Sequence, residues 1–153
     1  MAELMVTSPA FEHEGLIPVE HTGHGADMSP EIILSNIDNQ AVSIAIIMDD
    51  MGALMPAYNH WIIWNIPVTN TIPKSIPHGE TVEVLSGAIQ GRGYGKNRYR
   101  GPKPPFNQSH KYHFNVFVLD STLNLSSSSK KRDLVQAMHG HIIQQATLIG
   151  HYR

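Results

Sequence analysis

The feature that most constrains the fold is Val42–Met48 (VSIAIIM), a run in which serine is the only polar residue. A strand with one solvated face alternates apolar and polar residues, whereas a continuous apolar run is expected for a strand covered on both faces. The run is much shorter than the roughly 20 apolar residues that span a bilayer. We therefore expect this strand to lie inside a layered β-structure.

Two further segments have the β-branched and aromatic composition of strands, and each begins at or next to a histidine. In His60–Ile66, the period of two predicts one face that carries His60, Ile62 and Trp64. In Lys111–Leu119, it predicts one buried face with the preceding histidine at its entry, made up of His110, Tyr112, Phe114, Val116 and Val118. Glu80–Ile89 and Thr147–Tyr152 are the remaining predicted strands.

One helix is predicted, from about Lys130 to about Gln145. Ser129 is a suitable N-cap. Apolar residues then recur at the spacing of one helical face, at Leu134, Ala137, Met138 and Ile142. Gly140 weakens the middle of this helix by roughly 1 kcal/mol relative to alanine.

The 153 residues fit a single domain, residues 1–153, because domains usually contain about 100–200 residues. The ten prolines and the 16% of charged residues argue against a helical bundle and favour many short strands. Long loops rich in Gly and Pro are predicted at Pro18–Pro30, Met51–Asn59 and Gly91–Ser109. The predicted fold is mainly β, a β-sandwich of two packed antiparallel sheets with a short C-terminal helix.

The absence of cysteine excludes disulfides, zinc–thiolate sites and thiol catalysis. The N-terminus lacks the pattern of an export signal, so we expect a cytoplasmic protein. No Lys or Arg precedes Lys74, whereas Val84–Leu119 carries six cations and no acid. This basic segment either steers an anion to the Gly101 region or is a solvated cationic loop. The net charge of −2 argues against a nucleic-acid partner.

Ten histidines raise the question of a metal, but their spacing does not support one. His110 and His113 face opposite sides of a strand, and His139 and His141 lie about 200° apart on a helix. His21 and His24 could chelate, but no third ligand stands at a telling distance. We therefore predict no metal and no cofactor.

A non-covalent site for a small anion is the best remaining interpretation. Imidazole and phenol groups from His60, His110 and Tyr112 are suitable donors for a phosphate or carboxylate group. Asp50, at the end of the buried strand, would fix the tautomer of one histidine, whereas Asp49 is more simply a loop cap. Gly101 would let the backbone approach the ligand. No nucleophile is evident, so binding is favoured over catalysis; acid–base catalysis by a hydrolase or isomerase, and a pure protein-interaction role, stay open as alternatives.

Five segments resemble the phosphatidylethanolamine-binding proteins, also called Raf kinase inhibitor-like proteins, and especially their bacterial and archaeal branch. The matching segments cover nearly the whole chain: His21–Pro30 (HTGHGADMSP), Ile46–Met55 (IIMDDMGALM), His60–Pro67 (HWIIWNIP), Arg100–Phe114 (RGPKPPFNQSHKYHF) and Leu134–Arg153. Their order and spacing make the combination highly specific.

The resemblance implies a β-sandwich with a small anion-binding cavity. It implies ligand contacts from the residues Asp50, His60, Gly101, His110 and Tyr112. In the eukaryotic members, such a pocket accepts phosphorylated head groups and the surface regulates kinases. For the bacterial and archaeal branch, the resemblance implies a binding module whose physiological ligand is not fixed. We accordingly expect a small anionic or phosphorylated ligand, a protein partner such as a kinase, and a homodimer of the kind that this branch often forms. The chain departs from the signature at Gly52, where the family has a second Asp, and at Lys111, where it has arginine.

Overall fold

Strand β4 (Ser43–Asp50) lies at the centre of the larger of two sheets, and all of its residues are buried. The computed structural model describes residues 3–52, 58–105 and 108–153. The other strands are β1 (Met5–Thr7), β2 (Gly15–Leu16), β3 (Ile32–Ser35), β5 (Tyr58–Pro67), β6 (Thr71–Ile72), β7 (Thr81–Val82), β8 (Ala88–Gln90), β9 (His110–Leu119) and β10 (Ile142–Tyr152). The helical elements are η1 (Val19–His21), η2 (Glu83–Leu85) and α1 (Lys131–Met138).

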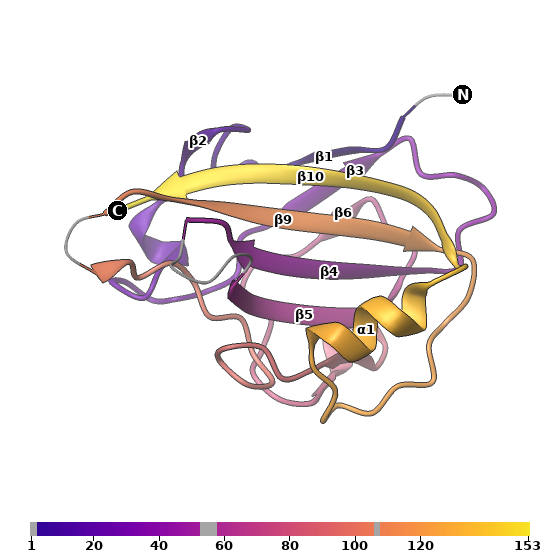
Figure 1. Ribbon diagram of the computed structural model, residues 1–153. Helices are drawn as coiled ribbons and strands as arrows, with labels where there is room; N and C mark the ends of the chain where they lie inside the picture. Colours follow the sequence, from indigo (N-terminus) through magenta and orange to yellow (C-terminus); the bar gives the residue numbers. More distant parts are fainter. Residues whose placement is uncertain (1–2, 53–57, 106–107) are drawn as a thin grey trace.

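The larger sheet has the strand order β2-β10-β9-β4-β5-β8-β7, and the smaller has the order β1-β3-β6 (Figure 1). Within the described ranges, neighbouring strands pair antiparallel except β2 and β10, which are parallel. The predicted β-sandwich of two sheets with one short helix is therefore confirmed. The part of the chain described here contains no helix long and apolar enough to cross a membrane.

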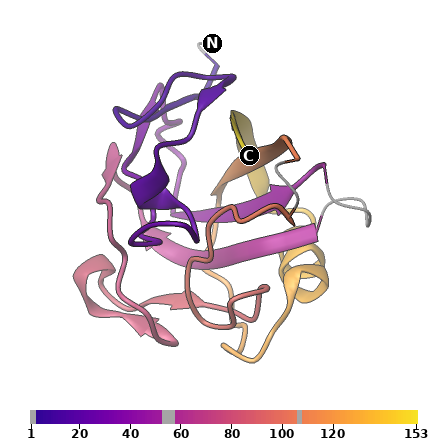
Figure 2. The same cartoon turned by 90° about the vertical axis from the view of Figure 1, so that its left-hand side faces the viewer.

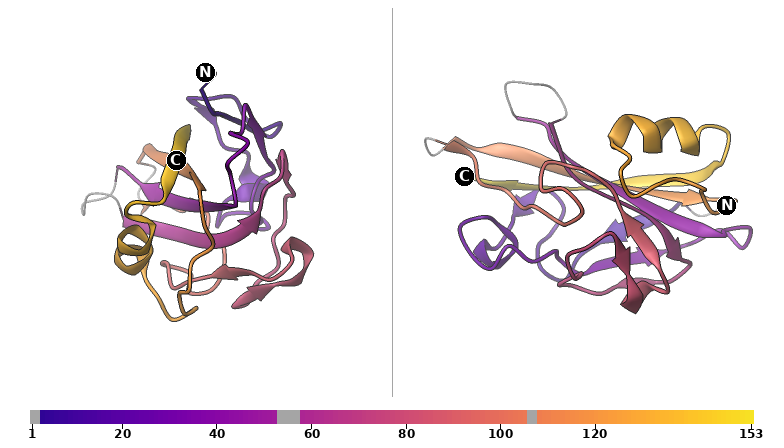
Figure 3. Two further views of the ribbon diagram at one scale, coloured as in Figure 1. Left: turned by 90° about the vertical axis from the view of Figure 1, so that its right-hand side faces the viewer. Right: turned by 90° about the horizontal axis from the view of Figure 1, so that it is seen from below.

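The larger sheet is covered on both faces, as the continuous apolar run predicted. One face packs against the smaller sheet and carries Ile44, Ile46 and Met48 of β4. The opposite face packs against α1 through Ile47 and other residues. Figure 2 shows the N-terminal segments and α1 on opposite sides of β4 and β5. The view from below in Figure 3 shows the same three layers.

The prediction that His60 shares a face of β5 with Ile62 and Trp64 is wrong. The pairing of β4 with β5 slips between Met48–Trp61 and Asp49–Asn59, so His60 is the extra residue of a β-bulge. Beyond such a bulge the alternation of faces is reversed. Ile62 and Trp64 consequently face α1, whereas the ring of His60 lies on the other face, beside Tyr112.

The predicted helix is shorter than expected. It ends at Met138, and residues 142–145 belong to β10, which therefore begins earlier than the predicted Thr147. Gly140 has φ +84°, a left-handed conformation that stops a helix. At the other end, Lys130 is the N-cap rather than Ser129, and its N–H donates to the Asp133 carboxylate at 2.9 Å.

The predicted strand Glu80–Ile89 is interrupted. It consists of β7, the 3-10 turn η2 and β8. Ser86 and Gly87 have φ values of +54° and +88°, which no extended strand can contain. The chain reverses there, and β7 and β8 pair with each other as a hairpin.

Candidate functional site

Asp50, at the end of β4, is the centre of a buried polar group on the face of the sheet opposite α1. Its Oδ1 accepts the N–H of Gly52 at 2.9 Å, and its Oδ2 lies 2.8 Å from Nδ1 of His110. A carboxylate only accepts hydrogen bonds, so Nδ1 of His110 carries the proton. Asp50 and His110 are 5% and 6% exposed. The Asp50–His110 bond therefore fixes the tautomer of this histidine.

His60 is anchored in the same way by a different partner. Its Nδ1–H donates to the carbonyl oxygen of Arg100 at 2.7 Å, since a carbonyl can only accept. Its Nε2 faces Oδ2 of Asp50 at 3.9 Å. Burial lowers the pKa of His60, and the hydrogen bond to Arg100 and the charge of Asp50 oppose this shift only in part. A neutral His60 then points a lone pair at Asp50.

Tyr112 completes this group, which we call the Asp50 cluster: Asp50, His60, His110 and Tyr112. The rings of His60 and Tyr112 meet edge to face with centroids 5.5 Å apart, and those of His110 and Tyr112 are 6.3 Å apart. Tyr112 is fully buried, and its hydroxyl has no hydrogen-bond partner among the residues described. Burial, the Asp50 charge and an interaction of the hydroxyl with the Asp50 carboxylate raise the pKa of Tyr112 far above its ordinary range, so the hydroxyl keeps its proton. A buried donor without a partner is costly and suggests a ligand.

Gly101 is held beside the cluster by a second network. Its N–H donates to Oδ1 of Asp27 at 2.7 Å, and Oδ2 of Asp27 pairs with Arg98 at 2.8 Å. A Cβ at position 101 would overlap the carbonyl oxygen of His21. The requirement for glycine therefore comes from the approach of another loop, and the N–H of Gly101 is already used in its hydrogen bond to Asp27.

The sequence analysis missed Tyr94, whose ring contacts the cluster at His60. The ring of Tyr94 lies 5.4 Å from that of His60 and 5.0 Å from that of Tyr58. The guanidinium of Arg100 stacks on Tyr94, 4.0 Å from the ring centroid. The available signal was an aromatic residue in the glycine-rich stretch GRGYGKN, at the start of the loop predicted for Gly91–Ser109.

The basic segment is partly neutralised in the fold. Arg98 is paired with Asp27, and Lys111 lies 3.6 Å from Glu14. The guanidinium of Arg100 stacks on Tyr94, whose ring contacts His60, and the backbone carbonyl of Arg100 accepts the hydrogen bond from His60.

Gly52 occupies the place of the second signature Asp and packs directly on His110. A Cβ at Gly52 would lie 3.0 Å from both Cα and Cγ of His110. A larger residue here would have to displace that histidine by a few tenths of an ångström. The missing carboxylate leaves Asp50 as the acidic group of the cluster.

Asp49 is on the opposite face of the sheet and does more than cap a loop. Its Oδ2 pairs with Lys131 of α1 at 2.7 Å, and its Oδ1 accepts from Asn59 at 3.1 Å. His113 is its partner on β9, as expected from the opposite parity of His110 and His113. The ion pair of Asp49 with Lys131 joins the start of α1 to the sheet.

The remaining histidines do not form a metal site in the described parts of the chain. Nδ1 of the buried His21 donates to the carbonyl of Met28 at 2.8 Å. His24 is exposed and lies 3.1 Å from the Tyr152 hydroxyl. His141 pairs with Asp120 at the surface.

Comparison with known proteins agrees with this geometry. The family model described as phosphatidylethanolamine-binding protein matches residues 7–153. A UPF0098 protein of Pyrococcus abyssi is 41% identical over 98% of this chain and 85% of its own length. Another from Methanothermobacter thermautotrophicus is 36% identical over 94% of this chain and 95% of its own length.

Two crystal structures share the fold over nearly the whole of both chains. The Escherichia coli protein YbcL, described as a member of the mammalian PEBP family, has a TM-score of 0.89 and 25% identity, with 99% of each chain covered. Chlamydia trachomatis CT736, described as a homologue of phosphatidylethanolamine-binding protein, has a TM-score of 0.87 and 28% identity, covering 100% of this chain and 99% of its own. The chain therefore belongs to the phosphatidylethanolamine-binding protein family.

Proposed function

We propose that this protein is a binding protein whose Asp50 cluster receives a phosphate-like or carboxylate group. The group belongs to a small molecule or to a phosphorylated side chain of a partner. The observation that carries the proposal is the fully buried Tyr112 hydroxyl, which lacks a hydrogen-bond partner beside two anchored imidazoles. A ligand oxygen would satisfy this donor. The family's name makes phosphorylethanolamine the first organic probe.

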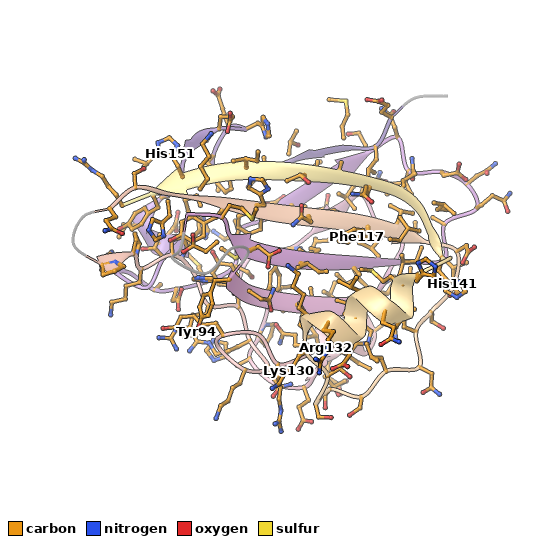
Figure 4. The ribbon with its side chains drawn as sticks, in the orientation of Figure 1. Tyr94, Phe117, Lys130, Arg132, His141 and His151 are labelled. Carbon is orange, nitrogen blue, oxygen red and sulfur yellow. The ribbon has the colours of Figure 1, made fainter. Side chains whose placement is uncertain are left out.

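The test is an NMR titration of the histidine and Tyr112 resonances with inorganic phosphate and with phosphorylethanolamine. We expect saturable shifts in the wild type at millimolar ligand and none in His110→Ala. His141→Ala is the matched control, because His141 lies at the far end of the larger sheet from Tyr94 (Figure 4) and pairs with Asp120 at the surface. The absence of shifts with either ligand at millimolar concentration would refute the proposal.

The Asp50–His110 bond also favours a second candidate, acid–base catalysis by a hydrolase or isomerase. An imidazole oriented by a carboxylate is an effective general base. This function predicts a bell-shaped dependence of rate on pH that is lost in His110→Ala as well as in His60→Ala. A screen of phosphate and carboxylate esters that finds no turnover above background argues for binding alone.

A regulatory role through a protein partner such as a kinase is part of the same proposal. If the partner presents a phosphorylated side chain to the cluster, phosphate competes with it and His110→Ala weakens the complex. A pull-down that is equal for the wild type and His110→Ala would separate the partner surface from the cluster.

A further inference from the structure

The free Asp50 cluster offers an anion too few donors. The Nδ1–H of His60 is given to Arg100, and that of His110 is given to Asp50. In the neutral forms, both Nε2 atoms are acceptors. The hydroxyl of Tyr112 is then the remaining donor of the four side chains; it makes no hydrogen bond of normal geometry among the described residues, although it lies near enough to Asp50 for that carboxylate to raise its pKa. A fully ionised phosphate or sulfate carries only acceptors. It can therefore accept a hydrogen bond from the Tyr112 hydroxyl, but it is repelled by the acceptor atoms of the two histidines and of Asp50.

Two acceptors also face each other before any ligand arrives. Nε2 of His60 is 3.9 Å from Oδ2 of Asp50, and in the neutral tautomer neither atom carries a hydrogen. Oδ2 of Asp50 already accepts from His110 at 2.8 Å. A proton on Nε2 of His60 would turn this opposition into attraction. Nε2 of His110 lies 3.4 Å from Oε1 of Gln108, so a proton placed there would meet a neutral amide oxygen, whereas a proton on Nε2 of His60 meets the Asp50 carboxylate.

The negative charge of Asp50 is a second reason to expect a proton in the filled site. An anion bound beside Tyr112 and His60 lies close to the Asp50 carboxylate, and two like charges in a buried site repel strongly. The guanidinium of Arg100 stacks on the ring of Tyr94, which contacts His60, rather than on a member of the cluster. A proton on the cluster itself would place a compensating charge directly against Asp50.

We propose that the Asp50 cluster binds its anion together with one proton, and that this proton resides on Nε2 of His60. The filled site then contains an imidazolium between the Asp50 carboxylate and the ligand, with Tyr112 as the second donor. This inference rests on the proposed function and adds its regulation: affinity rises as the pH falls. Burial lowers the pKa of His60 in the free protein, so the imidazole is neutral there at pH 7 and the proton must be taken up when the anion binds.

The groups that face His60 come from five parts of the chain. Asp50 on β4 and Asp27 in the loop before β3 favour its protonation, and Arg100 opposes it. Tyr58 on β5, Tyr94 in the glycine-rich loop and Tyr112 on β9 contact the ring with neutral edges or faces. An added anion shifts this balance toward the imidazolium because it supplies the opposite charge at short range.

Sulfate is the appropriate probe, because it does not change its own protonation state near neutral pH. Concentrated, unbuffered protein is titrated with sodium sulfate at about pH 7 while the pH is held constant by added acid. We expect the uptake to approach about one proton per sulfate bound, and the affinity to weaken by up to about tenfold per pH unit as the pH is raised. Sulfate that binds with no proton uptake and a constant affinity overturns this inference and leaves the proposed function standing.

Variants identify the site of the proton. His60→Gln should lose the uptake, whereas His113→Gln, which alters a histidine on the other face of the sheet with a similarly lowered pKa, should retain it. Uptake that survives in His60→Gln and disappears in His110→Gln places the proton elsewhere and refutes the assignment. If His60→Gln does not fold, long-range ¹H–¹⁵N spectra of the wild type with sulfate must show His60 protonated on both nitrogens. No binding of sulfate or phosphate at any pH refutes the proposed function as well.

Discussion

Asp50→Asn should reverse the tautomer of His110. The amide oxygen of Asn can still accept the N–H of Gly52, now made by Asp50 at 2.9 Å, and its NH₂ group then faces Nδ1 of His110. At 2.8 Å two N–H donors cannot face each other, so the histidine proton should move to Nε2. In the variant, a hydrogen bond between the neutral amide and His110 thus replaces the hydrogen bond between His110 and the charged Asp50 carboxylate.

The magnitude follows from this exchange of bonds. A hydrogen bond to a charged group contributes about 1.5–3 kcal/mol and a neutral one about 0.5–1.5 kcal/mol, so we expect a loss of about 1–2 kcal/mol. For a domain of this size, the melting temperature should fall by about 2–8 °C. Urea unfolding measures the free energy, and long-range ¹H–¹⁵N correlation spectra identify the protonated ring nitrogen.

The control is Asp49→Asn, one residue earlier on β4 but on the opposite face, where the carboxylate pairs with Lys131. This variant should lose stability without changing the spectrum of His110. If His110 keeps its proton on Nδ1 in Asp50→Asn, or if Asp49→Asn changes the tautomer equally, the role assigned to Asp50 is wrong.

Three further predictions concern stability. The pKa of His60 in the folded protein lies below its ordinary value of 6.5, so the stability that its neutral form contributes is complete above that pH. This stability is lost as the pH falls below 6.5, by at most about 1.4 kcal/mol per pH unit. Urea unfolding at about pH 8 and about pH 5.5 should therefore show a smaller fall in the free energy of unfolding for His60→Gln than for the wild type. Gly101→Ala should cost about 1–3 kcal/mol, because the new Cβ would overlap the carbonyl of His21 and lie 2.7 Å from Oδ1 of Asp27; a melting temperature equal to that of the wild type would contradict this. Gly140→Ala meets no atom within 4 Å, yet should cost roughly 1 kcal/mol because of its φ of +84°, and an unchanged or higher melting temperature would show that the turn after α1 relaxes.

The elements that the sequence predicted well are those with a strong periodic signal. The alternation in β9 placed His110 and Tyr112 on the face that carries Phe114, and the apolar run in β4 showed that both of its faces are covered. Both patterns come from the geometry of a strand, which each residue obeys regardless of its distant neighbours. The errors lie where one backbone dihedral decides the outcome. Gly140 could have been a weak point within a longer helix, but its left-handed conformation made it the end of one.

The amino-acid sequence by itself determined the family, the β-sandwich and the identity of the clustered residues, because residue types and periods are local properties. The tertiary structure alone decided the orientation of His60, since a single bulge, set by the pairing of β4 with β5, moves that ring to the opposite face of the sheet. It likewise decided that the Nδ1–H of His60 donates to the carbonyl of Arg100, whereas that of His110 donates to the carboxylate of Asp50. Those partners come from distant segments of the chain, and which of them meet depends on packing rather than on spacing.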